Sequence, residues 1–167
     1  MSSRRLRYFA ALVAWGTLAL PPPTGQAHAV RVPAAGASAC GSMLTFGLIP
    51  AWARAGFSDN RPHLPRALGR RGEIVAISFS GKLFSPPSRT INNKLLWVAR
   101  RPHDSLSDLH ISAQWMAGPQ RLGRPVSRVV SGGPGPSTID LPHAGCWRLT
   151  LAWSGRQDTL DLRYAKP

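Results

Sequence analysis

The sequence predicts an all-β protein, an immunoglobulin-like β-sandwich of about six to eight short antiparallel strands that follows a signal peptide. Apolar and polar residues alternate in several short runs, which is typical of strands with one buried face. The chain of 167 residues contains 16 glycines and 16 prolines, and turn residues recur between these runs. No segment beyond the first thirty residues keeps a helical period for more than about two turns.

The first segment has the three parts of a secretory signal peptide. Residues 4–7 carry a cluster of arginines, Tyr8–Leu20 is apolar, and Ala27–Ala29 has the small residues of a cleavage site. The apolar run is short for a membrane-spanning helix. We therefore expect removal of residues 1–29 and export to the cell envelope or beyond. The alternative is an uncleaved segment that anchors the protein in a membrane.

Residues 30–42 read as a flexible leader, and residues 43–167 as the β-sandwich domain. Two cysteines remain after cleavage, Cys40 and Cys146. An even number of cysteines in an exported protein predicts a disulfide, which would contribute about 4 kcal/mol by closing so long a loop. Lipidation of Cys40 is the alternative, because small residues precede it as in a lipobox, although the leucine at its head is missing.

Strands are expected wherever alternation or β-prone residues form a short run, and turn residues separate them. Ala51–Phe57 reads as one helical turn, and Ser58–Gly72, with two prolines and four arginines, reads as a loop. The expected strands before the C-terminal hairpin are Met43–Pro50, Glu73–Ser80, Lys82–Ser85, Lys94–Arg100, Asp108–Met116, Gln120–Val130 (an edge strand) and Ser137–Leu141.

The clearest pattern is a C-terminal hairpin. Its buried face would carry Trp147, Leu149, Leu151 and Trp153 on one strand and Leu160, Leu162 and Tyr164 on the other. A two-residue turn at Gly155-Arg156 would set Leu151 opposite Leu160, so that apolar side chains meet.

On the outer face of this hairpin, the same register would set Arg148 opposite Arg163, which is mildly unfavourable. Cys146 shares that outer face with Arg148 by alternation. Cys40 would therefore reach the hairpin from outside and hold the leader across the sheet.

The charge suggests an anionic partner. The formal charge is +14, and removal of the three arginines in residues 1–29 lowers it to +11. An anionic envelope polymer, a membrane surface or an envelope protein would suit such a chain. The alternative is compositional, since 18 arginines against 3 lysines is typical of a GC-rich genome.

Binding candidates are few. Arg66, Arg70 and Arg71 could form a basic patch, or simply a solvated loop. No aromatic residues lie between these arginines, which disfavours nucleic acid. Trp52 is a further candidate, because the other mature tryptophans fall within expected strands.

The mature chain contains no recognised catalytic or metal-binding motif. His103, Asp104 and His110 are the nearest approach to a catalytic group, and capping of a loop and strand is the alternative for them. We expect no cofactor and no metal site.

The C-terminal part resembles a group of exported bacterial proteins of unknown function. These proteins share a short L-W-V strand, here Leu96–Val98, then an L-x-I strand before a turn, here Leu109–Ile111. They close on a P-S-x-aliphatic motif that runs into G-C-W-x-aliphatic-T, here Pro136 to Thr150. The resemblance implies an exported β-protein and carries no activity.

Together these observations predict a monomeric, non-catalytic binding or envelope-accessory module. Two alternatives remain open: a small exported hydrolase that uses the His/Asp candidates, and a purely structural or inhibitor module.

Overall fold

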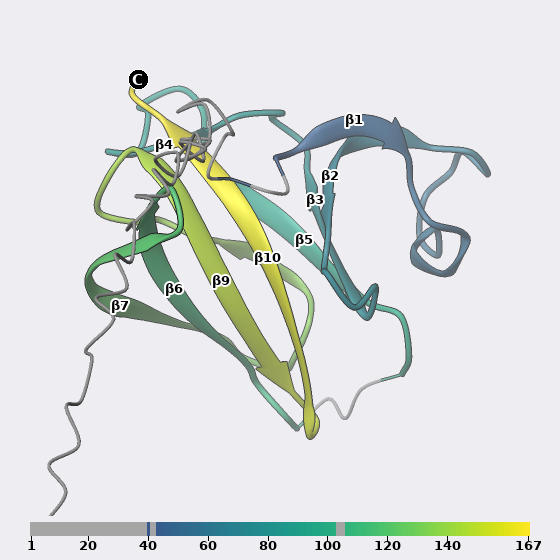
Figure 1. The fold of residues 1–167 in the computed structure, drawn as a ribbon. Helices are drawn as coiled ribbons and strands as arrows, with labels where there is room; N and C mark the ends of the chain where they lie inside the picture. The colour runs from purple at the N-terminus through teal and green to yellow at the C-terminus, as the bar shows by residue number, and fades with distance from the viewer. Residues whose placement is uncertain (1–39, 41–42, 103–105) are drawn as a thin grey trace, which may run out of the picture. The chain divides into compact units, whose positions relative to one another are not determined.

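A computed structural model describes residue 40 and residues 43–102 and 106–167, all within one compact unit, Ala35–Pro167. The expected signal peptide, most of the leader, and both His103 and Asp104 lie outside the described residues. The described residues form two five-stranded sheets and one 3-10 helix, Ala51–Ala53 (Figure 1). The predicted all-β, two-sheet architecture is confirmed.

Both sheets have a clear strand order. The first sheet consists, in spatial order, of β1 (Thr45–Leu48), β2 (His63–Leu68), β3 (Ile74–Ser78), β5 (Lys94–Ala99) and β8 (Pro136–Thr138). The second consists of β4 (Leu83–Phe84), β10 (Arg156–Ala165), β9 (Gly145–Trp153), β6 (Leu109–Ala117) and β7 (Gln120–Val130). The long strand β7 lies at an edge, as its arginines and proline predict.

The two sheets pack face to face. Trp97 of the first sheet and Trp147 and Tyr164 of the second are among the largest fully buried side chains. A smaller apolar cluster covers the opposite face of the first sheet, where Val75 and Ile77 meet the segment that holds the 3-10 helix. Strand β3 is therefore buried on both faces and shows no polar alternation.

Three strand expectations are wrong. The segment Ser58–Gly72 is not a loop, because it contains β2. Pairing of β2 with β3 starts at Arg66, so Pro65 has a neighbouring strand only on its β1 side. The described residues form ten strands rather than about six to eight, and β4 runs parallel to β10, so the sheets are not entirely antiparallel.

The C-terminal hairpin forms with the predicted buried face but with a different turn. Trp153 pairs with Arg156, so the two-residue loop is Ser154-Gly155 and not Gly155-Arg156. Both loop residues have positive φ, 43° and 69°, which is the backbone of a type I′ turn.

The register of the hairpin accordingly differs from the prediction by two residues. Leu149 lies opposite Leu160, whereas Leu151 was expected there. Each side chain stays on its predicted face, because the shift is an even number of residues. On the outer face, Arg148 meets Asp161 instead of Arg163, which replaces an expected repulsion by an ion pair.

A β-bulge alters β7. Between the pairs Ala113–Val126 and Trp115–Leu122, β6 contributes one residue and β7 contributes three, Gly123–Pro125. The pairing of β6 with β9 is not shifted, so Trp115 stays on the predicted face, opposite Trp147, and packs against the core although it is only partly buried. Met116 lies on the other face, opposite Cys146, and is also buried.

Asp158 ties the second sheet to the β2–β3 turn of the first. Its side chain is buried and accepts hydrogen bonds from the backbone N–H groups of Arg71 (2.9 Å), Glu73 (2.9 Å) and Thr159 (2.7 Å). A Cβ atom at Gly69 would collide with this carboxylate, so glycine is required at that position. One buried carboxylate thus organises a whole turn.

Asp161 holds the middle of the hairpin. It is fully buried and accepts from Arg148 Nε at 2.9 Å and from Arg70 Nη2 at 3.1 Å. The hydrogen bond to Asp161 raises the pKa of the Arg148 guanidinium. Tyr164, near the end of β10, donates to the Ile139 carbonyl at 2.7 Å, and burial raises the pKa of its phenol.

We predict that Asp158→Asn lowers the free energy of unfolding by about 3 kcal/mol. The amide has the size of the carboxylate, but it loses the charge and turns an NH₂ group toward backbone donors. Urea unfolding measures the effect. Asp59→Asn is the matched control, because Asp59 is exposed and, among the described residues, accepts only from Arg61 N. It should change the stability by less than about 0.5 kcal/mol. Equal effects at both positions would contradict this role for Asp158.

Candidate functional site

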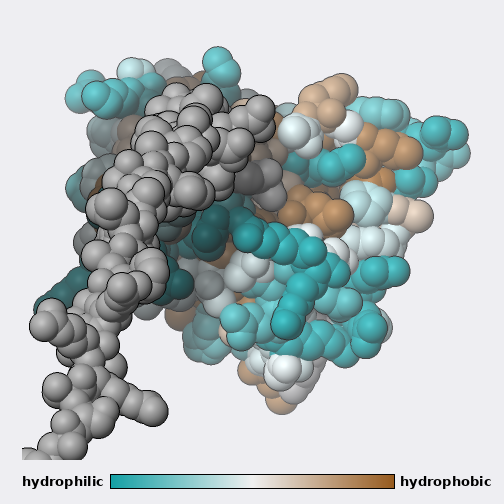
Figure 2. All heavy atoms as spheres, in the orientation of Figure 1, coloured by the Kyte–Doolittle hydropathy of each residue, from teal (hydrophilic) through white to brown (hydrophobic). Residues whose placement is uncertain are grey.

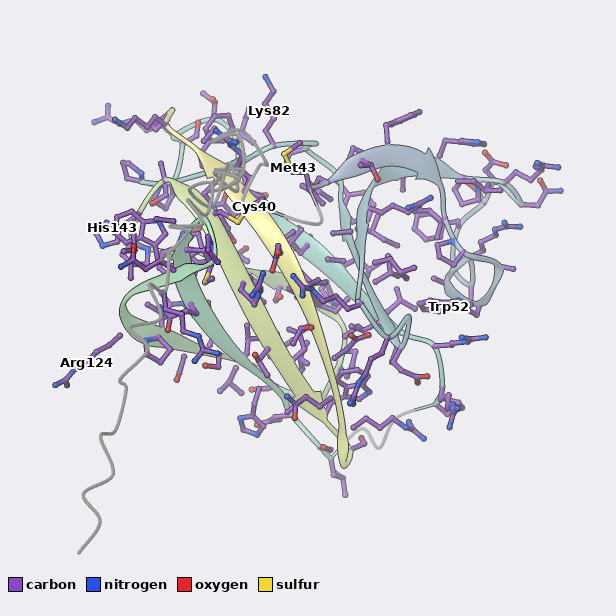
Figure 3. All side chains as sticks on the ribbon, viewed as in Figure 1. Cys40, Met43, Trp52, Lys82, Arg124 and His143 are labelled. Atoms are coloured by element: carbon purple, nitrogen blue, oxygen red, sulfur yellow. A yellow bond between two sulfur atoms is a disulfide. The ribbon has the colours of Figure 1, made fainter. Side chains whose placement is uncertain are left out.

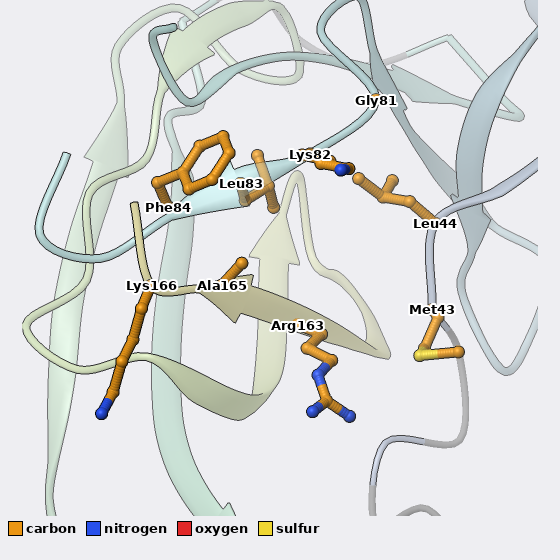
Figure 4. A pocket seen from close by; sticks show the side chains of 9 residues that line it. All are labelled: Met43, Leu44, Gly81, Lys82, Leu83, Phe84, Arg163, Ala165 and Lys166. Carbon is orange, nitrogen blue, oxygen red and sulfur yellow. The ribbon is translucent and has the colours of Figure 1, made fainter. Parts of the chain in front are cut away.

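A cleft lies where the edge strand β4 and the end of β10 approach the start of β1 (Figure 4). Its volume is about 330 Å³. We call it the basic cleft, and its lining residues are Met43, Leu44, Gly81, Lys82, Leu83, Phe84, Arg163, Ala165 and Lys166. Apolar side chains therefore form much of its wall, and three cations belong to it.

The β4 wall of the basic cleft is held by a buried asparagine. Asn93 accepts from Phe84 N at 2.7 Å and donates to the Phe84 carbonyl at 2.9 Å, so it satisfies both backbone groups of that residue. Its amide also donates to Asp140 Oδ1 at 2.7 Å. A two-residue strand is too short to be stable by itself, and this side chain takes the place of a further strand.

Serine residues fix the two ends of β4. At the far end, Ser85 N donates to the Ala165 carbonyl at 2.9 Å and Ser85 Oγ to the Leu141 carbonyl at 2.6 Å. At the near end, Ser78 Oγ accepts from Gly81 N at 3.1 Å, and Ser80 Oγ donates to the Lys82 carbonyl at 2.9 Å. The backbone that carries Lys82 is therefore held in place on both sides.

The Cys40–Cys146 disulfide fixes the opposite wall. The predicted bond is present, with Cα atoms 5.5 Å apart, and it joins Cys40 to the outer face of β9 as alternation predicts. Met43 and Leu44 lie between this anchor and β1, which begins at Thr45 (Figure 3). Because the Cys40 sulfur is used in the disulfide, it is not available for lipidation.

The three cations of the basic cleft are exposed and have no acidic partner among the described residues. None of the described lining residues is acidic. Asp161 lies two residues before Arg163 in β10, but its carboxylate is already bound by Arg148 and Arg70. Lys82, Arg163 and Lys166 thus leave positive charge uncompensated beside an apolar wall.

The arginines singled out in the sequence have intramolecular contacts. Arg66 Nε donates to the Leu48 carbonyl at 2.7 Å, and Arg70 pairs with Asp161. Arg71 lies with Arg70 on the β2–β3 turn and donates through Nη1 to the Gln157 carbonyl at 3.4 Å. Arg70 and Arg71 share the turn, whereas Arg66 is directed to β1.

Trp52 is half-buried and lines a second hollow of about 400 Å³. Leu96 and Val98 of β5 and the exposed Arg100 and Arg101 contribute to the same hollow. Arg101 lies 3.8 Å from a Glu73 carboxylate oxygen, so part of the charge there is compensated. This hollow is less basic than the basic cleft.

Of the His/Asp candidates, the structure describes only His110. It is exposed on β6, opposite Ala152 of β9. The nearby Asp108 accepts from Gly132 N at 3.0 Å and so supports a loop. In the described part of the chain, no three His, Cys, Asp or Glu side chains are grouped to hold a metal ion.

Sequence reasoning did not single out Lys82, Arg163 or Lys166. Lys82 and Arg163 are brought together by the parallel pairing of β4 with β10, in which Leu83 lies opposite Tyr164. Strands β4 and β10 are far apart in the sequence, so their parallel pairing produces no local sequence pattern that would reveal it. The only available signal was that a lysine precedes one short apolar strand and another follows the last strand.

Comparison with protein-family models, with curated proteins and with solved structures finds no match. No helix in the described ranges has both the length and the apolar character needed to span a membrane. The disulfide indicates an oxidising compartment, such as the extracellular space.

We predict that the Cys40→Ser/Cys146→Ser double variant loses about 4 kcal/mol of unfolding free energy, because the disulfide closes a loop with a sequence separation of 106. Thermal unfolding with and without dithiothreitol measures it. The reductant should destabilise the original protein to the same degree and leave the double variant unchanged. A reductant-insensitive original protein would contradict the bond.

Proposed function

We propose that this protein is an exported, non-catalytic binding module of immunoglobulin-like build that holds an anionic partner at the basic cleft. The observation that carries the proposal is the group of three exposed cations around a concave wall with no acidic residue among its described lining. A group of cations in a concave site with no acid in its described lining favours recognition of an anion.

Export is supported by independent features. The arginine-rich start and apolar run of residues 4–20 suit a signal peptide, and the Cys40–Cys146 disulfide suits an oxidising compartment. The resemblance of the closing Gly145–Thr150 segment to exported bacterial proteins agrees with this compartment. An anionic component of the cell envelope is the partner that such a location would offer.

The proposal does not rest on the net charge of the protein alone. Arg70 and Arg148 are bound to Asp161, so these two cations stabilise the fold. The cations of the basic cleft have no such structural use among the described residues. A binding role explains why they remain unpaired.

We predict that the double variant Lys82→Glu/Lys166→Glu binds polyphosphate, a polyanion without any alkyl chain, at least about tenfold more weakly than the original protein does. Arg121→Glu/Arg124→Glu on the exposed edge strand β7 makes the same charge change and should have an effect below about twofold. Figure 3 shows Arg124 far from Lys82. Isothermal titration calorimetry measures both.

Binding by the original protein should also weaken steeply between about 0.05 and about 0.5 M salt. Equal losses in the two double variants would mean that net charge, and not the basic cleft, attracts the anion. Absence of binding to any anionic probe at low salt would refute the proposed function.

A further inference from the structure

We propose that the ligand of the basic cleft is a single-chain anionic amphiphile, with one alkyl or acyl chain and one phosphate, sulfate or carboxylate head. This inference rests on the proposed function and adds an apolar chain to the anion. Its basis is the apolar wall beside the three cations, which a simple polyanion would not need.

The apolar wall is open to solvent. Met43 is 45% exposed, Leu44 and Phe84 are half-buried, and Ala165 is exposed. Figure 2 shows a separate hydrophobic surface over β1 and β2, outside the lining of the basic cleft, with hydrophilic side chains around it. A concave apolar wall costs free energy in water, and an alkyl chain that covers it removes this cost.

The cations lie on two sides of the cleft. In Figure 4, Lys82, which precedes β4, extends toward Leu44, whereas Arg163 of β10 and Lys166, which follows β10, extend to the opposite side. Lysine side chains present an apolar stem and a charged tip. A chain can therefore lie along the wall and a lysine stem while its head reaches the cations on one side of the cleft.

The size of the basic cleft favours one chain. Its volume of about 330 Å³ is at the lower end of the range for small-molecule sites. A two-chain lipid would leave most of one chain in water. The cleft therefore suits a dispersed single-chain molecule better than a lipid within a bilayer.

The walls are already in place before a ligand arrives. Asn93 and Ser85 hold β4, and the disulfide fixes Cys40, three residues before Met43. A preformed site loses little conformational entropy on binding. Met43 itself can still adapt, because its unbranched thioether side chain is flexible.

A chain-length series tests the inference. Hexyl, octyl and decyl phosphate are titrated below their critical micelle concentrations, with tripolyphosphate as the chain-free reference. Affinity should rise about fourfold for each added methylene until the wall is covered. If affinity is independent of chain length while polyphosphate still binds, the inference is wrong and the proposed function stands. If no anion binds with or without a chain, both fail.

Two apolar variants locate the chain. Met43→Ser should weaken decyl phosphate about tenfold and leave tripolyphosphate unchanged, because only the chain contacts Met43. Val129→Ser on β7 is the matched control, with a similarly exposed apolar side chain (54% against 45%), and it should change neither affinity. Equal losses at both positions would contradict a chain in the basic cleft.

Anionic vesicles separate a dispersed amphiphile from a membrane surface. The protein should bind vesicles of phosphatidylglycerol and phosphatidylcholine no more tightly than it binds free decyl phosphate, when the two are compared at the same concentration of accessible anionic groups. Binding to vesicles without any binding to dispersed alkyl phosphates would overturn the single-amphiphile proposal in favour of a bilayer surface.

Discussion

The register of β10 against β9 is the constraint on which the other features depend. It places Asp158 beneath the β2–β3 turn, Asp161 opposite Arg148, and Ala165 alongside Phe84 of β4. A shift of two residues would preserve the buried face but break all three relations. The hydrophobic pattern therefore selects the face, while a turn and two buried carboxylates select the register.

This one strand also connects stability with the candidate site. Its first half is bound to the first sheet through Asp158, and its second half forms one wall of the basic cleft. The disulfide and Asn93 hold the segments that face that wall. The cations can thus stay exposed and unpaired, because other interactions hold their backbone.

The sequence predicted those features that depend on local pattern. Alternation identified both strands of the hairpin and their buried faces, and the parity of Cys146 placed the disulfide on the outer face. The turn was misplaced because glycine was assumed at its first position, whereas Ser154 adopts positive φ there. Charge pairing could have identified the correct register, because the observed register pairs Arg148 with Asp161, whereas the predicted register placed Arg148 opposite Arg163.

Other features could not be read from the chain. The strand β2 contains Pro65, and proline is a reasonable sign of a loop when the neighbouring strands are unknown. The basic cleft arises from the parallel pairing of β4 with β10, which brings Lys82 to the side of Arg163. The dense group of arginines at Arg66, Arg70 and Arg71 was selected instead, and the structure shows Arg70 and Arg71 in contact with β10.

The central claim is that an anionic amphiphile binds at the basic cleft, and amide chemical-shift mapping of ¹⁵N-labelled protein with decyl phosphate tests it most directly. We expect the shifts to concentrate on Met43–Leu44, Lys82–Phe84 and Arg163–Lys166, with saturation at one equivalent. Shifts centred on Trp52 and Arg101, or spread evenly over exposed arginines, would contradict it.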